Sequence, residues 1–246
     1  ERSTGRFIIG ADGARSNVRK SIGVSFEGIT HPELYLTLST TFPYEEHVEN
    51  LAKIAYISDP DEWLVLLRTP KVWRVLFPTN PAIGDDVMLA PETVEKRLQA
   101  VVPATGRYNI VHKTAYRVFE RVCDRYFVDR VLLAGDAAHL NNPLGGMGMN
   151  GGIHDAINLA EKIAQVWRGA DPALFGRYER QRRKVALETV QAVSLRNRQI
   201  MNTREPAARA AYFDEMRRTA ADPEKSRAYL LRSSMIQSLR ELDGVE

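Results

Sequence analysis

The sequence contains a single cysteine, Cys123, and no long apolar run. One cysteine excludes a disulfide within the chain and favours a reducing compartment, so we expect a cytoplasmic protein. No stretch approaches the roughly 20 consecutive apolar residues that a transmembrane helix needs. The start of the chain shows no signal-peptide pattern. We therefore expect no transmembrane segment.

Most short catalytic motifs are missing as well. The five histidines form no His-Glu-x-x-His pattern, and no Cys-x-x-Cys pair accompanies them, which argues against a metal site. There is no Gly-x-Ser-x-Gly elbow and no phosphate loop. No Gly-x-Gly-x-x-Gly follows a strand and opens a helix, and the chain starts at Glu1 rather than at methionine. From these two absences we expect a fragment that lacks its N-terminal part.

Excess charge is small and local. The net charge of +3 is too mild to indicate nucleic acid as a partner. Between residues 168 and 240, basic residues outnumber acidic ones by two to one. Such a surplus on helices is typical of a solvated face or of a subunit contact, as in a homodimer, rather than of contact with an anionic membrane surface.

The stretch from Arg130 to Gly152 organises the chain. It opens with the apolar run of residues 131–134, which is typical of a strand buried on both faces. Gly135 and Asp136 follow, and they place a carboxylate at the carboxyl end of that strand, where open α/β sheets bind ligands. The pattern after Gly152 predicts a helix from Ile153 to Val166, with an apolar face formed by residues 153, 156, 157, 160, 163, 164 and 167.

Glycines dominate the loop before that helix. Five glycines in the eight residues from Gly145 to Gly152 leave little side chain between the backbone and a ligand. The N–H groups and the positive dipole end of the following helix favour negative charge on that ligand. His139 lies between the strand and the loop, and we expect it to hold the loop by hydrogen bonds rather than to act as an acid or base. The strand, the Gly-Asp pair, the glycine loop and the helix together predict a ligand-binding corner.

A second corner lies near the start of the chain. Residues 6–9 predict a strand, and Asp12 and Gly13 follow it as a tight turn with a second carboxylate. Ser16 is a good N-cap for a brief helix through Ile22. By itself this segment is equally well explained as an ordinary β-turn-α connection.

Between the two corners the sequence predicts an antiparallel sheet with one helix. The strand-like runs are rich in β-branched and aromatic residues, and prolines punctuate them. We expect strands at 34–42, 54–58, 63–68, 72–77 and 109–118, the third and fourth forming a hairpin, and a helix at 91–101. After residue 169 the chain reads as helical almost to its end, with Pro172, Pro206 and Pro223 each opening a helix.

These motifs resemble those of the FAD-dependent aromatic hydroxylases, the single-component flavoprotein monooxygenases typified by p-hydroxybenzoate hydroxylase. The segment 135–150 is similar to the second flavin-binding motif of that family, and the segment 10–19 to its Asp-Gly motif. Residues 155–162 and 178–183 continue the pattern. The family's N-terminal dinucleotide-binding βαβ unit, which holds the ADP half of FAD, is missing from the sequence.

The resemblance implies a fold and a domain division. The fold class is mixed α/β: an FAD/NAD(P)-binding three-layer fold, truncated at the N-terminus, with an inserted antiparallel β-sheet and C-terminal helices. Residues 1–25 and 119–168 would form the incomplete FAD-binding domain, 26–118 the substrate domain, and 169–246 a C-terminal helical region.

The resemblance also implies roles for individual residues. Asp136, after Gly135, would accept a hydrogen bond from a ribitol hydroxyl of FAD. The loop would lie along the flavin, with the N–H groups of 148–150 near its N1 and O2 edge, and Pro143 would lie beside the ring. Asp12 and Gly13 would order the region near the FAD pyrophosphate, and NAD(P)H could bind near them as well. The cofactor-binding set is Asp12, Gly13, Gly135, Asp136, Pro143, Gly145, Gly146, Met147, Gly148, Met149 and Asn150; no catalytic acid or base can be named.

The implied activity is hydroxylation of a small aromatic substrate, phenol- or quinol-like, with FAD as cofactor and NAD(P)H as cosubstrate. The cofactor would carry the chemistry through a flavin C4a-hydroperoxide, while the protein supplies position and electrostatics. Two alternatives stay open. One is a related flavoprotein, such as a halogenase, an epoxidase or an isoprenoid reductase, because fold analogy does not decide the reaction. The other is an inactive truncated fragment that serves only as an interaction domain.

Overall fold

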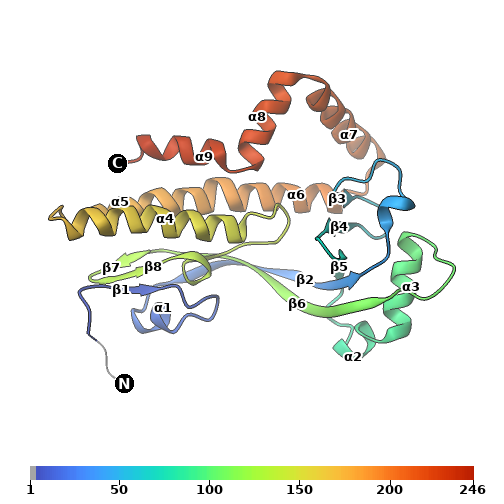
Figure 1. Ribbon diagram of the computed structural model, residues 1–246, viewed down its shortest axis with the longest axis horizontal. Helices are drawn as coiled ribbons and strands as arrows, with labels where there is room; N and C mark the ends of the chain where they lie inside the picture. Colours follow the sequence, from blue (N-terminus) through green and yellow to red (C-terminus); the bar gives the residue numbers. More distant parts are fainter. Residues whose placement is uncertain (1–3) are drawn as a thin grey trace. The chain divides into compact units, whose positions relative to one another are not determined.

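The computed structural model describes residues 4–246, which form two compact units. Unit 1 contains the residues up to Ile29, Phe119–Arg198 and Ala210–Glu246, and unit 2 contains Thr30–Val118 and Gln199–Arg209. The long strands β2 (Phe26–Thr40) and β6 (Ile110–Cys123) and the helix α6 (Ala192–Asn202) each contribute residues to both units (Figure 1).

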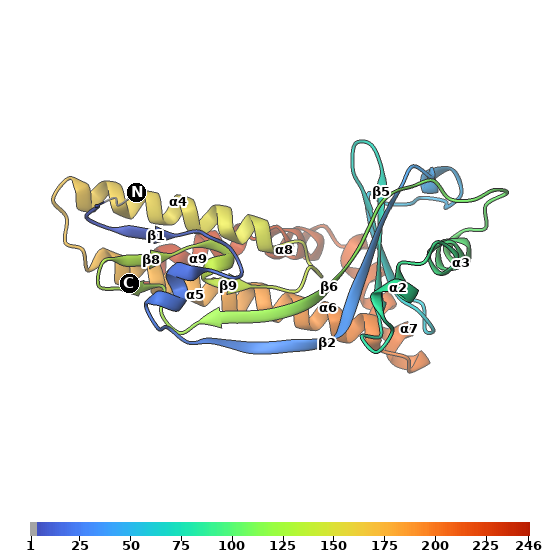
Figure 2. The same cartoon turned by 90° about the horizontal axis from the view of Figure 1, so that it is seen from below.

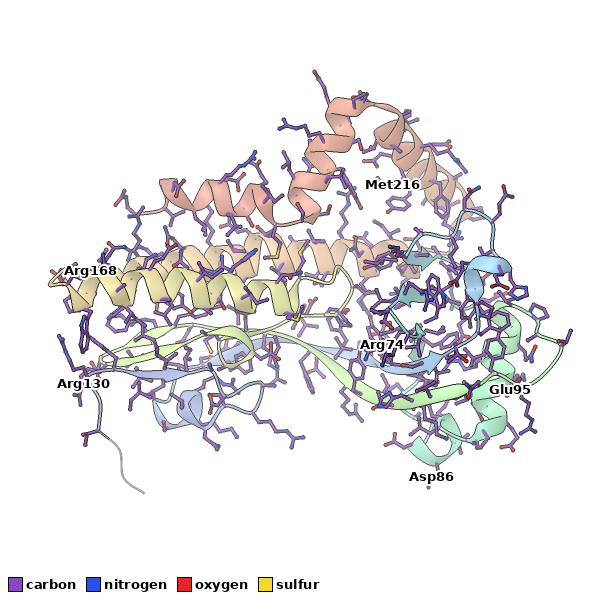
Figure 3. The ribbon with its side chains drawn as sticks, viewed as in Figure 1. Arg74, Asp86, Glu95, Arg130, Arg168 and Met216 are labelled. Carbon is purple, nitrogen blue, oxygen red and sulfur yellow. The ribbon has the colours of Figure 1, made fainter. Side chains whose placement is uncertain are left out.

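Unit 1 is built on a small sheet with the strand order β1-β8-β7. β1 (Ile8–Gly10) is parallel to β8 (Val131–Leu133), and β7 (Phe127–Val128) is antiparallel to β8. The short helix α1 (Asn17–Ser21) follows β1. The helices α4 (Gly148–Trp167) and α5 (Leu174–Lys184) pack on each other and run along the sheet in both views (Figures 1 and 2). Arg168 marks the end of α4 in Figure 3.

One apolar core holds the sheet and these helices together. Tyr178 of α5 is fully buried, and its hydroxyl donates to the Leu133 carbonyl of β8 at 2.6 Å. Burial of aromatic and aliphatic side chains is the main stabilising contribution here, at about 1.5–3 kcal/mol for each large side chain. The buried members of this core are Val122, Cys123, Tyr126, Leu132, Leu133, Ala134, Ala138, Leu159, Val166, Phe175, Tyr178 and Ala186.

The remaining unit 1 elements include a π-helix, η3 (Val185–Gln191), which joins α5 to α6. The 3-10 turn η2 (Gly135–Ala137) and the strand β9 (His139–Leu140) lie between β8 and α4, and β9 pairs with the end of β6. The helices α7 (Pro206–Ala221), α8 (Pro223–Ser233) and α9 (Ile236–Glu241) and the 3-10 turn η4 (Leu242–Gly244) close the chain. Among the described helices, none is both long and apolar enough to cross a membrane.

Unit 2 is an antiparallel sheet with helices packed against it. The strand β3 (Ile54–Ile57) pairs with β4 (Leu64–Arg68), and β4 pairs with β5 (Trp73–Thr79). On its other side β5 pairs with β2, and β2 lies next to β6 in the sheet. The other elements are η1 (Tyr44–Glu46), α2 (Asp85–Met88) and α3 (Pro91–Val101). Because side chains alternate along a strand, every second residue of β2 joins one core. That core contains Leu34, Leu36, Leu38, Tyr44, Leu64, Leu66, Trp73, Val75, Phe77, Met88, Val94, Leu98 and Tyr108.

The mixed α/β fold with an antiparallel sheet, expected from the sequence, is confirmed, and so are the β4–β5 hairpin and the helix at 91–101. Two expectations about α4 were wrong. The helix begins at Gly148, not Ile153, because the Gly151 N–H already donates to the Met147 carbonyl at 2.7 Å. The expected apolar face is also partly exposed: Ile157 and Trp167 are 54% and 70% accessible.

Candidate functional site

Two corners of the chain meet at one edge of the unit 1 sheet. Gly10 of β1 lies opposite Leu133 of β8, and the Ala134 N–H donates to the Gly10 carbonyl at 3.0 Å. Parallel strands end at the same edge, so the corner after β1 (residues 12–13) and the corner after β8 (residues 135–136) are neighbours. This is the edge at which open α/β sheets bind their ligands.

Arg19 of α1 connects the two corners. Its buried guanidinium donates to the carbonyl of Ala14 at 2.7 Å and to that of Ala137 at 2.9 Å. It also lies over the ring of Phe26, 3.8 Å from the centroid. A guanidinium suits this position because its planar fork donates in two directions while its face stacks on an aromatic ring. The sequence showed no sign of this role, since nothing in a five-residue helix marks one basic residue as buried.

The carboxylate of Asp12 is engaged within the protein. It accepts hydrogen bonds from the Ser16 hydroxyl and from the N–H groups of Asn17 (2.7 Å) and Val18 (3.2 Å). The Ser16 hydroxyl is the main cause that lowers the pKa of Asp12, and the backbone N–H groups add to it. Asp12 therefore stabilises the start of α1, and Ser16 is the N-cap that the sequence predicted. Gly13, with φ +79°, has open space where a Cβ would lie.

Asp136 differs from Asp12. It lies in η2, is exposed to solvent, and its carboxylate makes no hydrogen bond or ion pair with any residue that the structure describes. Gly135, with φ +61°, turns the chain sharply before it. A solvent-facing carboxylate with free lone pairs, at the carboxyl end of a parallel strand, can accept hydrogen bonds from hydroxyl groups of a ligand.

The glycine loop presents backbone on one side and buries side chains on the other. Pro143, Gly146 and Met149 are exposed, whereas Met147 is only 4% exposed and packs in a core with Val185, Val190, Met235 and Leu242. The Gly146 N–H donates to the Pro143 carbonyl at 3.0 Å and closes a tight turn. Gly146 has φ +66°, and nothing lies within 4 Å of the position of a Cβ, so a flat group can approach the backbone there.

Gly148, Met149 and Asn150 form the first turn of α4, directly after this loop. Their N–H groups have no partner earlier in the helix, and the dipole of a 20-residue helix adds positive potential at the same point. The Asn150 side chain donates to the Gly146 carbonyl at 3.2 Å. The arrangement suits a planar ligand with a partly negative edge. The flavin of FAD is such a group, so the loop, Asp136 and the helix start fit it.

A buried ionic cluster supports this corner from behind. Asp155 of α4 is fully buried and accepts from the Gly135 N–H at 2.9 Å, from His139 Nε2 at 2.8 Å and from Arg182 Nε at 2.6 Å. Arg182 is 1% exposed and also donates to the Gly151 carbonyl at 3.2 Å. One carboxylate therefore ties together η2, β9, α4 and α5. His139 holds the loop through this cluster.

Sequence reasoning did not identify Asp155 or Arg182 as part of the site. A signal was present: Asp155 lies four residues after Gly151 and four before Leu159, on the face of α4 that is buried. An acid on a buried face needs a cation partner. The hydrophobic periodicity favoured the neighbouring face, which is more apolar but packs less closely.

Neither a nucleophilic thiol nor a metal site is supported by the described residues. Cys123 is fully buried, and burial raises its thiol pKa to about 12, so it is not a nucleophile at neutral pH. No group of three or more potential metal-ligating side chains occurs within residues 4–246.

The chain matches a known protein family and known monooxygenases along most of its length. The model of the FAD binding domain family matches residues 1–193. Para-nitrophenol 4-monooxygenase of Pseudomonas sp. (strain WBC-3) is 32% identical over 243 residues, which are 97% of this chain and 60% of that protein. The 6-hydroxy-3-succinoylpyridine 3-monooxygenase HspB of Pseudomonas putida is 31% identical over 76% of this chain and 47% of its own length. The chain thus spans about half the length of these relatives.

Solved structures agree with these matches. The p-nitrophenol 4-monooxygenase PnpA of Pseudomonas putida DLL-E4 superposes with a TM-score of 0.84, at 32% identity, over 95% of this chain and 59% of that one. Aklavinone-11 hydroxylase, solved with FAD and aklavinone, superposes with a TM-score of 0.69 at 28% identity over 77% of this chain and 36% of that one. The chain therefore belongs to the FAD binding domain family.

Proposed function

We propose that the protein is an FAD-dependent monooxygenase that hydroxylates a phenol- or quinol-like molecule with NAD(P)H and O2. The observation that carries the proposal is the corner at the end of β8, where the exposed, unpartnered Asp136 faces the same edge as the open glycine loop and the start of α4. The names of the two relatives given above, which are monooxygenases of nitrophenol and of a hydroxypyridine, support the reaction class.

Within this proposal the protein binds and orients the cofactor. Asp136 would accept a hydrogen bond from a ribitol hydroxyl, and the N–H groups of Gly148 to Asn150 would stabilise negative charge at one edge of the flavin. Gly146, with open space beside its backbone, and the exposed Pro143 leave room for the ring, while Gly145 turns the loop and Met147 contributes backbone only, since its side chain is buried. FAD, when bound and reduced by NAD(P)H, supplies the activation of O2.

The test is a substrate panel on the FAD-loaded protein. NAD(P)H oxidation and O2 uptake should rise when 4-nitrophenol, another phenol or a quinol is added, and the stimulating compound should gain one oxygen atom by mass spectrometry. Comparing NADH with NADPH identifies the reductant. A protein that retains FAD but shows no stimulation with any member of the panel would disprove the hydroxylase activity.

Replacing Asp136 with alanine should weaken FAD binding about ten- to a hundredfold. The reason is the loss of one charge-assisted hydrogen bond, which contributes on the order of 1.5–3 kcal/mol. Titration of flavin fluorescence with the protein measures the dissociation constant. Asp86→Ala, at an exposed carboxylate of α2 labelled in Figure 3, is the matched control and should leave it unchanged. Equal FAD affinity in the two variants would mean that Asp136 is only a turn residue.

A cytoplasmic location and a homodimer stay predictions. The lone, buried Cys123 supports a reducing compartment, and fractionation of cells measures the location. The charge pattern of residues 168–240 is the basis for the homodimer, which light scattering on the purified protein tests.

A further inference from the structure

A cavity of about 340 Å3 lies within unit 1, between α4, α5 and the segment of α9 and η4. Its volume is in the range of small-ligand pockets. The cavity is separate from the flavin corner, because it is lined by residues 154–165 of α4, whereas the corner uses residues 148–150 of that helix. Most of the side chains that line it are polar or charged, so the cavity suits a polar ligand.

Lys162 is the unusual member of this lining. It is only 7% exposed, and its ammonium donates to Asn158 Oδ1 and to Gln181 Oε1, both at 2.8 Å. Both acceptors are neutral amides, and Lys162 forms no ion pair with any described residue. A buried charge without a partner of opposite sign is costly. An ammonium has three N–H donors, so one is left for a group inside the cavity.

Neighbouring cations increase the deficit of negative charge around Lys162. Burial lowers the pKa of its ammonium, the Arg177 guanidinium lowers that pKa further, and Glu161 only partly opposes them. Arg177 also lines the cavity. Its guanidinium donates to two backbone carbonyls of residues 243–245, and its Nη1 makes no hydrogen bond with a described residue. Lys162 and Arg177 therefore both lack a carboxylate partner within the described chain.

Two carboxylates line the cavity, but neither neutralises the buried ammonium. Glu161 and Asp243 are exposed, and neither forms an ion pair with a described residue. Exposed charges are screened by water and salt, and buried charges are screened much less. His154, which also lines the cavity, has a buried Nδ1 without a partner in the described chain. Burial and, to a lesser extent, Arg182 lower the pKa of His154, so its ring is neutral at pH 7 and can donate one hydrogen bond.

We propose that this cavity binds a small oxyanion, a carboxylate or a phosphate, which supplies the counter-charge for Lys162 and accepts further hydrogen bonds from Arg177 and His154. The inference is independent of the proposed function, since none of these residues belongs to the flavin corner. An ammonium and a guanidinium are common partners of both kinds of oxyanion. The bound anion neutralises the buried cation and so stabilises the folded state over the unfolded state.

The test compares thermal unfolding of the protein in sodium phosphate, succinate and acetate with unfolding in sodium chloride of the same ionic strength. At an anion concentration about tenfold above the dissociation constant, the melting temperature should rise by roughly 3–6 °C. Calorimetric titration of each anion measures binding directly. The comparison of phosphate with the two carboxylates decides which oxyanion the cavity prefers.

Two substitutions should remove this response for different reasons. Lys162→Met replaces the ammonium with a neutral side chain of similar length, which needs no counter-charge. Asn158→Asp places a carboxylate oxygen where the amide oxygen now lies, 2.8 Å from the ammonium, so the chain itself supplies the counter-charge. Lys184→Met, at an exposed lysine of α5, is the matched control and should respond as the parent protein does.

The response of the variants decides between the site and its alternatives. Loss of the response in Lys162→Met and Asn158→Asp, with retention in Lys184→Met, supports the site. A rise in melting temperature that persists in Lys162→Met is a general salt effect and overturns the proposal. Absence of any response in the parent protein overturns it as well. Should Lys162→Met fail to fold, a full response in Asn158→Asp would be sufficient to reject the site.

Discussion

Replacing Asp155 with asparagine should lower the free energy of unfolding by about 3–5 kcal/mol, the usual cost of removing one partner from a buried ion pair. Asp155 is fully buried and Arg182 is 1% exposed, so the substitution leaves a guanidinium without a counter-charge in the interior. The hydrogen bond from the Gly135 N–H weakens at the same time. Urea denaturation measures the loss of stability, and FAD titration of the folded fraction should show weaker binding.

The same residue predicts how stability depends on pH. Burial alone would raise the pKa of the Asp155 carboxyl, but His139 and Arg182 outweigh burial and hold the pKa below its ordinary value of 3.8. A carboxyl with a lowered pKa in the folded state contributes stability that is full above the unfolded pKa and lost as pH falls through the folded pKa. The parent protein should therefore lose stability on acidification below about pH 5, and Asp155→Asn should lose less over the same range.

The control is Asp214→Asn, which makes the same chemical change in an exposed pair with Arg217. Exposed pairs contribute about 0–1 kcal/mol, so this variant should unfold almost as the parent does. Similar losses in the two variants would mean that the buried cluster is not the source of stability at the β8 corner.

The fold was predictable where one physical signal dominated. The strands of unit 2 are rich in β-branched and aromatic residues and several are followed by a proline, and the β4–β5 hairpin follows from two such runs separated by a short turn. The length of β2 was not predictable, because Phe26–Thr40 contains Gly28 and Pro32 and these residues normally interrupt strands. The buried face of α4 was missed because its polar members, Asp155 and Lys162, are satisfied by partners far away in the sequence.

The candidate site was predictable as a set of corners, since Gly-Asp after a buried strand and glycines before a helix are local patterns. The sequence did not predict which carboxylates of these corners are free to bind a ligand. Asp12 and Asp136 look equivalent in the sequence, yet Asp12 accepts from Ser16, Asn17 and Val18, and Asp136 accepts from none of the described residues. The contacts of Arg19 with Ala137, 118 positions away, depend on tertiary packing that no local pattern encodes.

Replacing Gly28 with alanine should be comparably damaging, with a loss of about 2–6 kcal/mol of unfolding free energy, from backbone strain and from overpacking. Gly28 has φ +151°, and a Cβ would lie 2.0 Å from the Glu120 carbonyl oxygen and 2.8 Å from the Arg121 Cα. All of these contacts are backbone atoms of β6, so no side-chain rotation relieves them, and the two strands must move apart.

Gly106→Ala is the matched control, because nothing lies within 4 Å of its Cβ position and its backbone is not in the left-handed region. It should change stability by no more than about 0.5 kcal/mol, as surface substitutions usually do. Thermal and urea unfolding of the two variants compares the same added methyl group with and without the clash. If Gly28→Ala unfolds like Gly106→Ala, then β2 and β6 do not approach as closely as described.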